Sequence, residues 1–413
     1  MFESATNILS RALSRGRAVG AVVTNAPALS PDEWREDLRH LARELPRRHK
    51  NAFHTVTRER FETAATEFDE AIPSLNDDEV VVGLLRLVAL VGDARTELAP
   101  PDSFRRYPLS FYWFGQELRV IRAGAPYARA LGARLVRIGE VRAEEAAARV
   151  NALVPRENEQ WVRALNVSYL NTAEVLGALK ILPDPGRGSW TFEGEDGCEF
   201  TLDVDAIAPG ESVEWVSASA GVTPLYRQRL GEPYWFTTLT DSQTVYVNLK
   251  GYPDRGAFKR TSEELFKVIE EARIERLVVD LRQNRGGDYN RARLLLLDGL
   301  LKRTELKGPG RVYVIVGRAT QSAAVVTALD FRKALGATIV GEPTGGRPNA
   351  YTEGERFELP RSRLKVSYAT RYLKLQDEET HAVMPDQLFE PSWDAYRAGT
   401  DPALEWIQTR QLP

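Results

Sequence analysis

Residues 311–331 read RVYVIVGRATQSAAVVTALDF, and the rest of the C-terminal half is organised around them. The stretch opens with an apolar run, Val312 to Val316, whose length and β-branched content predict a buried strand. A short polar turn follows, and Ser322 then precedes small and apolar residues that suit a packed helix. A serine between a buried strand and a helix lies at the carboxyl edge of a sheet, where its hydroxyl can face a crevice and free amides can receive an anion. Ser322 is therefore a candidate nucleophile, and the alternative is that it only caps the helix.

Two nearby stretches have glycine-rich turns after short strands. Residues 276–287 read RLVVDLRQNRGG and end in Gly286 and Gly287, and residues 337–346 read ATIVGEPTGG. Paired glycines after a strand let backbone N–H groups point at a ligand, although a tight turn that only glycine can make is the alternative. The repeated order of strand, turn and helix predicts an α/β core.

This sequence contains VVDLRQNRGG, GRATQSAA and GEPTGG. These motifs resemble those of the catalytic core of the C-terminal processing (tail-specific) proteases, and they have the same order and similar separations. The sequence resembles this family of serine peptidases over residues 245–386. It is closer to the branch of the tricorn core protease and interphotoreceptor retinoid-binding protein than to the Ser-Lys branch. The resemblance implies an α/β fold with a crotonase/ClpP-like ββα core domain, an N-terminal helical bundle and a degenerate PDZ-like α+β module.

The chain then divides into five expected segments. The bundle begins at a good helix start, Ser30-Pro31-Asp32-Glu33. The PDZ-like module is indicated by a strand, a glycine turn and an alanine-rich helix after Leu131. The segments are a poorly ordered N-terminus (1–29), the helical bundle (30–100), the PDZ-like mixed module (108–205), a connecting arm (206–243) and the serine-protease-like core (244–413).

The resemblance also implies the parts of an active site. Ser322 matches the family's nucleophile, and backbone N–H groups match the donors of its oxyanion hole, each worth about 3 kcal/mol to the tetrahedral intermediate. The residues implied as oxyanion donors are Ala323 and Gly286 or Gly287, and those implied on the substrate-binding side are Gly345, Gly346 and Arg347.

Both bases of the family are replaced by arginine. Arg347 stands where the lysine branch has its lysine, after Gly-Glu-x-Thr-x-Gly. Arg95, in the phrase Gly92-Asp93-Ala94-Arg95-Thr96, stands where the tricorn-like branch has a histidine. A guanidinium stays protonated far above neutral pH, so neither arginine can accept the proton of Ser322 at a useful rate.

Other residues are candidates for the remaining roles. Glu379 matches the glutamate that orients the tricorn-like base, and a salt bridge between Arg95 and Glu379 is expected; a solvated acidic loop is the alternative. His381 is a candidate replacement base, and so are His49 and His54, although a lone histidine is more often structural.

Composition excludes several classes of protein. The 413 residues carry a net charge of −3, which implies no basic field for nucleic acid. Cys198 is the only cysteine and the four histidines have no ligand spacing, so we expect no metal and no cofactor. No apolar run is long enough for a membrane span or for a signal peptide, which predicts a cytoplasmic protein without membrane contact. The expected partner is a peptide or a protein C-terminal segment, and a homo-oligomer stays open.

Three functions are compatible with these residues. The first is a serine peptidase that forms an acyl-enzyme at Ser322 with an atypical base. The second is a catalytically inactive pseudo-protease that binds peptides or carboxylates, with Arg95 and Arg347 gripping the anion. The third is an acyl-transfer or cyclising enzyme built on the same serine.

Overall fold

The computed structural model describes residues 29–411 except residues 220, 240 and 241. The N-terminus that the sequence predicts to be poorly ordered (1–29) lies outside the described residues, except for residue 29. The described part is a mixed helix and sheet protein, so the predicted α/β class is confirmed at that level.

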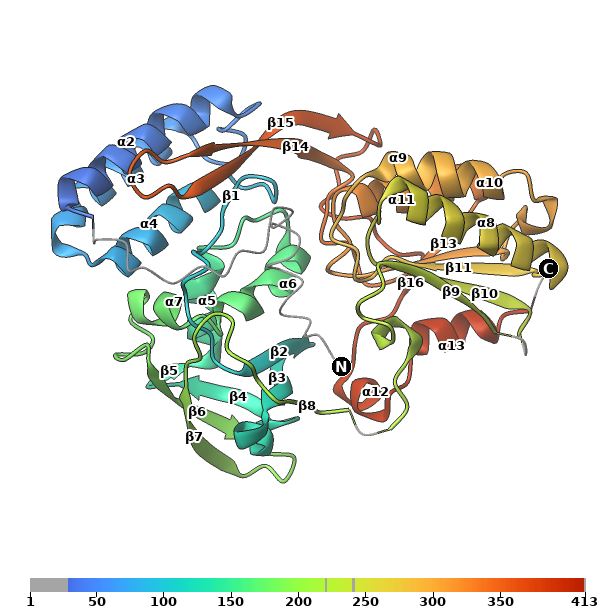
Figure 1. Cartoon of the computed structure of the whole chain (residues 1–413), viewed down its shortest axis with the longest axis horizontal. Coiled ribbons are helices and arrows are strands. Elements are labelled where there is room, and N and C mark those ends of the chain that lie inside the picture. Colours follow the sequence, from blue (N-terminus) through green and yellow to red (C-terminus); the bar gives the residue numbers. More distant parts are fainter. Residues whose placement is uncertain (1–28, 220, 240–241, 412–413) are drawn as a thin grey trace.

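Three helices open the described chain (Figure 1). Ser30 caps the first through a reciprocal capping box with Glu33, so the helix start predicted at this phrase is confirmed. Asn76 and Glu79 cap the third helix in the same way. The helices are α2 (Pro31–Arg48), α3 (Arg58–Ala71) and α4 (Asp77–Ala89), with a short 3₁₀ turn η1 (Ile72–Ser74) after α3.

A mixed module follows, in which an antiparallel sheet packs on three helices. The sheet order is β2-β3-β4-β6-β7, with β5 paired to β4 and β8 paired to β3. Its strands are β2 (Leu109–Phe114), β3 (Glu117–Gly124), β4 (Arg134–Ile138), β5 (Val141–Arg142), β6 (Arg187–Glu193), β7 (Glu199–Asp205) and β8 (Trp215–Ser217). Its helices are α5 (Ala143–Asn151), α6 (Glu159–Tyr169) and α7 (Ala173–Ala178), and η2 (Ala125–Ala130) and η3 (Leu225–Arg227) are 3₁₀ turns.

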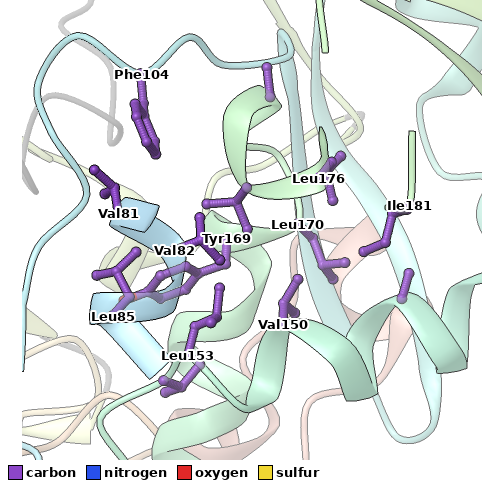
Figure 2. Packing of buried hydrophobic residues seen from close by; sticks show 14 of the residues in the cluster. Val81, Val82, Leu85, Phe104, Val150, Leu153, Tyr169, Leu170, Leu176 and Ile181 are labelled. Atoms are coloured by element: carbon purple, nitrogen blue, oxygen red, sulfur yellow. The ribbon is translucent and has the colours of Figure 1, made fainter. Parts of the chain in front are cut away.

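The N-terminal helices and the mixed module share one hydrophobic core. In Figure 2, Val82 and Leu85 of α4 face Tyr169 at the end of α6, with Leu153 close by. Burial of these side chains joins α4 to the module, and each buried aliphatic or aromatic side chain contributes about 1.5–3 kcal/mol to the hydrophobic stabilisation. The two segments therefore form one packed unit.

The C-terminal half is built on a six-stranded sheet of order β16-β13-β12-β11-β10-β9. All of its pairs are parallel except β10 with β9, and every residue of β10, β11 and β12 is buried, because helices cover both faces. The strand predicted from Val312 to Val316 is β12 itself. The strands are β9 (Tyr234–Leu239), β10 (Thr244–Leu249), β11 (Arg276–Asp280), β12 (Val312–Val316), β13 (Thr338–Gly341) and β16 (Gln387–Leu388).

Helices of this half are short except for two. Residues 288–301, predicted as one helical stretch, form α9 (Tyr289–Ala292), a π-turn η5 (Arg293–Leu297) and α10 (Asp298–Leu300). The others are α8 (Arg255–Glu271), α11 (Ala323–Leu335), α12 (Trp393–Ala398) and α13 (Pro402–Gln408), with a 3₁₀ turn η6 (Thr304–Leu306).

A long hairpin connects the two halves. β14 (Asn349–Glu358) and β15 (Lys365–Lys374) leave the C-terminal core and reach the N-terminal helices (Figure 1). There β15 pairs with β1 (Glu97–Leu98), with Glu97 opposite Ser367. At the hairpin tip, the buried carboxylate of Asp37 accepts the backbone N–H groups of Arg361 and Ser362, each at 2.8 Å. We call this hairpin the arm.

Candidate active site

Ser322 occupies a strained turn between β12 and α11. Its φ of 55° and ψ of −119° lie where L-residues are rarely found. A sharp strand-to-helix turn of this kind lifts a serine hydroxyl clear of the sheet, and such strain is characteristic of functional sites. Ser322 makes no side-chain capping hydrogen bond to α11, so helix capping does not explain the serine.

Hydrogen bonds from both neighbouring turns hold this strained turn. Gln321 N donates to Asn284 O at 3.0 Å, which joins the turn to the loop after β11. Thr320 Oγ1 donates to Leu281 O at 2.8 Å, and Gly346 N donates to Thr320 O at 3.0 Å. The three motifs quoted from the sequence therefore meet at one place.

Gly286 lies directly against Ser322. It has a φ of 107°, and a Cβ added to it would come within 2.9 Å of Ser322 Cβ and 3.4 Å of Ser322 Oγ. Its N–H donates to Asn284 Oδ1 at 2.9 Å, so this donor is already occupied. The N–H groups of Gly287 and Ala323, in contrast, make no hydrogen bond to any residue that the structure describes.

The glycine-rich turn after β13 closes the other side of Ser322. A Cβ on Gly346 would lie 3.1 Å from Ser322 N, and a Cβ on Gly345 would lie 2.2 Å from Arg318 O and 3.1 Å from Trp161 Cε3. Neither position has room for a side chain. Trp161 belongs to α6, so the mixed module contributes to the wall of the site.

Arg347 contacts a residue that the sequence interpretation missed. Its Nε donates to the backbone oxygen of Glu157 at 2.8 Å. Glu157 Oε2 in turn accepts the N–H of Ala94 at 3.0 Å, and the residue is 2% exposed. Burial raises the pKa of Glu157 to about 7, with a further raising effect from Asp93. No motif signals Glu157, because it lies far along the chain from every word that resembles the family.

Arg95 and Glu379 do not meet, so the predicted salt bridge between them is wrong. Arg95 is exposed and lies along the arm, where a Cβ on Gly354 would come within 3.0 Å of Arg95 Nε. Glu379 Oε1 accepts instead from Asn349 Nδ2 at 3.0 Å and from Tyr372 OH at 3.2 Å. The carboxylate of Glu379 is thus hydrogen-bonded by uncharged side chains of the arm, near the end where the arm leaves the C-terminal core.

The three histidines have different surroundings. His49 is buried, with Nε2 2.9 Å from Asp93 Oδ2 and Nδ1 accepting the N–H of Asn51 at 2.9 Å, so both ring nitrogens are occupied. His54 has Nδ1 2.9 Å from Asn51 O, and burial lowers its pKa. His381 is exposed, and the hydrogen bond that fixes it runs from Asn158 Nδ2 to its backbone oxygen, at 2.6 Å. The structure brings none of the three into hydrogen-bond contact with Ser322 Oγ.

An aromatic row connects the histidines with Glu379. The ring of Tyr351 lies 4.2 Å from that of His54 and 5.0 Å from that of Tyr372, centroid to centroid. Tyr372 OH then donates to Glu379. Two of its rings, Tyr351 and Tyr372, belong to β14 and β15 of the arm.

One cation beside the site is left without a carboxylate. Arg285 precedes Gly286 and is exposed, and its guanidinium lies 5.9 Å from the centroid of the Trp161 ring. In the described part of the chain it forms no ion pair. An anionic group of a ligand could reach it from the surface.

Within residues 29–411, apart from the three omitted positions, no cluster of His, Cys, Asp or Glu side chains has the arrangement of a metal site. Among these same residues, no helix is both long and apolar enough to cross a membrane.

Comparisons with known proteins find similarity in structure alone. No family model matches this sequence, and no curated protein sequence does either. Mature CPAF complexed with lactacystin matches with a TM-score of 0.62 at 11% identity, over 91% of this chain and 97% of that one. A CPAF mutant matches with a TM-score of 0.63 at 10% identity, over 93% and 99%. The photosystem II D1 C-terminal processing protease is more distant, with a TM-score of 0.44 at 14% identity over 90% and 98%. This chain therefore has the fold of the CPAF structures along most of its length.

Proposed function

We propose that this protein is a serine peptidase-like hydrolase of the C-terminal processing protease type, which forms an acyl-enzyme at Ser322 with a peptide substrate. The observation that carries the proposal is the strained backbone of Ser322, held against Gly286 with no capping role for the hydroxyl. The cost of such strain is of the order of 1–3 kcal/mol, which a purely structural serine would not need.

In this proposal Ser322 Oγ attacks the carbonyl carbon of a peptide bond. The tetrahedral oxyanion is received by the unoccupied N–H groups of Gly287 and Ala323, because the N–H of Gly286 is already bound to Asn284. Collapse of the intermediate expels the amine, and water later releases the acyl group. Gly345 and Gly346 form the wall beside Ser322 along which the substrate backbone lies.

The substrate that fits best is a peptide or the C-terminal segment of a protein. Arg285 is an uncompensated cation at the edge of the site, and a guanidinium pairs well with a terminal carboxylate. The finer architecture belongs to the same proposal: a crotonase-like core at residues 244–413 and a degenerate PDZ-like module at residues 108–205.

A second candidate function is a pseudo-protease that binds carboxylate-bearing peptides without cleaving them. It is favoured by the absence of any side chain hydrogen-bonded to Ser322 Oγ among the described residues, and by the same free Arg285. Arg347 is less suited to grip a ligand, because its Nε is bound to Glu157 O.

Labelling with a fluorophosphonate probe separates the two functions. We expect stoichiometric labelling of the full chain near neutral pH, read by intact mass, and no labelling of Ser322→Ala. Ser262→Ala is the matched control, because Ser262 is fully buried and bonded to Tyr234, away from the site. A wild-type chain that stays unlabelled between pH 5 and pH 9 would favour the binding module.

A further inference from the structure

One aromatic side chain lies between the two segments that carry the free N–H groups beside Ser322. Gly287 belongs to the turn after β11, and Ala323 begins α11 after β12. Tyr252 follows β10, and because β10, β11 and β12 are parallel, all three segments meet at the same edge of the sheet. The side chain of Tyr252 contacts both of the other segments.

The ring of Tyr252 packs directly against the backbone of Gly287. Gly287 has a φ of 145°, and a Cβ added to it would lie 2.6 Å from Tyr252 Cδ2 and 3.3 Å from Tyr252 Cγ. No side chain fits between the ring and this backbone. The same ring stacks on that of Phe258 in α8, with centroids 6.3 Å apart, and Phe258 is fully buried. The hydrophobic core therefore fixes the ring that limits how far the turn of Gly287 can move.

The hydroxyl of Tyr252 is bound to α11. Its oxygen lies 2.8 Å from Thr327 Oγ1, and Thr327 Oγ1 donates to Ala323 O at 2.9 Å. The Thr327 hydroxyl has one hydrogen, which Ala323 O receives, so the Tyr252 hydroxyl is the donor to Thr327. This chain of two hydrogen bonds ends at the first residue of α11.

Asn284 joins the same arrangement to the turn after β11. It is fully buried, its Nδ2 donates to Leu249 O at 2.8 Å, and its Oδ1 accepts the N–H of Gly286 at 2.9 Å. Burial raises the pKa of the Tyr252 hydroxyl, and hydrogen bonds with Thr327 and Asn284 oppose this effect only in part. The phenol therefore stays protonated at neutral pH, where it can donate a hydrogen bond but cannot act as a base.

We propose that Tyr252 is a positioning residue that sets the distance between the two oxyanion donors, the N–H groups of Gly287 and Ala323. Its ring holds the first donor, and its hydroxyl holds the second through Thr327. The oxyanion that forms when Ser322 Oγ attacks a carbonyl carbon needs both N–H groups at hydrogen-bond distance at the same time. Tyr252 acts on the reaction only through the backbone that it contacts. This inference rests on the proposed hydrolase function.

The test measures fluorophosphonate labelling of the full chain as a function of probe concentration, because the phosphoryl oxygen of the probe takes the place of the oxyanion. Tyr252→Phe keeps the ring and removes the bond to Thr327. We expect its maximal labelling rate to fall about 10-fold, since a displaced donor stabilises the transition state less, and its half-saturating probe concentration to stay unchanged.

Thr327→Val removes the same bond from the other side and is expected to show at least the same loss of maximal rate. The double variant should label no more slowly than Thr327→Val alone, because both changes remove one bond.

Tyr234→Phe is the matched control. Tyr234 is buried, its hydroxyl oxygen lies 3.1 Å from Ser262 Oγ, and its ring lies against the same Phe258, with centroids 4.6 Å apart. The variant therefore loses a hydrogen bond of the same kind, between a tyrosine and an aliphatic hydroxyl, without changing the bond to Thr327. We expect it to label at the wild-type rate.

The outcomes distinguish the two proposals. An unchanged maximal rate in Tyr252→Phe overturns the positioning role and leaves the hydrolase function standing. An equal loss in Tyr234→Phe also overturns it, because the loss would then come from the core around Phe258. If circular dichroism shows that Tyr252→Phe does not fold, Thr327→Val decides alone, and wild-type kinetics there overturn the role. A wild-type chain that does not label at any pH ends both proposals.

Discussion

A close contact between two turns shapes the environment of Ser322. Gly286 has no side chain and a positive φ, and both properties are needed for the loop after β11 to approach Ser322. The position of Ser322 therefore depends on a residue that contributes no side chain of its own.

Gly286→Ala is expected to reduce labelling of Ser322 by more than about 10-fold, because its new Cβ would lie 2.9 Å from Ser322 Cβ and displace the serine. Gly308→Ala is the control, since Gly308 has a φ of 116° with nothing within 4 Å of an added Cβ. Both variants carry the same kind of backbone strain, of about 1–2 kcal/mol. Only the first should lower the labelling rate relative to wild type. Equal rates for the two variants would contradict the contact argument.

At the residue scale, short sequence motifs predicted which residues lie close together, whereas single charged residues did not predict their ion-pair partners. The proximity of Ser322 to Gly286 and Gly346 could be predicted, because the strands and turns that carry them are encoded by neighbouring residues. The contact of Glu157 with Arg347 could not be predicted, since the two residues lie far apart in the chain. The expected Arg95–Glu379 pair was wrong for the same reason: the path of the arm decides which charges meet.

Among the elements, the arm is the one that joins the halves of the molecule. β15 supplies the partner of β1, and the tip of the arm is held by Asp37 on α2. The sequence predicted β12 and the start of α2, whose signals are local. It did not predict the arm, because the strand that β15 joins lies in the distant N-terminal half of the chain.

Asp37→Ala is expected to destabilise the protein by about 1–3 kcal/mol, because two backbone N–H groups lose a buried acceptor. Glu36→Ala provides the comparison: Glu36 binds the side chain of the same Arg361, but both partners are about half exposed. Such a surface pair contributes less than about 1 kcal/mol. Urea unfolding would measure both changes. A larger loss for Glu36→Ala would refute the anchoring role of Asp37.

Considered as a whole, the molecule builds its site from both halves. The N-terminal half contributes Glu157, Asn158 and Trp161, and the C-terminal sheet contributes Ser322 and the glycine-rich turns. Composition and motifs predicted the C-terminal contribution and the class of the fold. The contribution of residues at the start of α6 could not be predicted, because it depends on how one half of the molecule packs against the other.

Asn158→Ala is expected to lower the labelling rate of Ser322, because Asn158 binds the glycine-rich turn as well as capping α6. Asn76→Ala is the matched control, since Asn76 caps α4 and makes no bond to the C-terminal half. Loss of either cap costs about 1 kcal/mol of stability. Thermal unfolding should therefore respond in both variants and the labelling rate only in Asn158→Ala. Unchanged labelling in Asn158→Ala would show that the contact does not position the site.

The pairing of β1 with β15 also orders events during synthesis of the chain. Glu97 leaves the ribosome long before Ser367, its partner, which lies 270 residues further along the chain. Until then the N-terminal half presents an unpaired strand edge, of the kind that chaperones protect. The nascent chain consequently cannot complete the pairing of β1 with β15 until the arm has been synthesised.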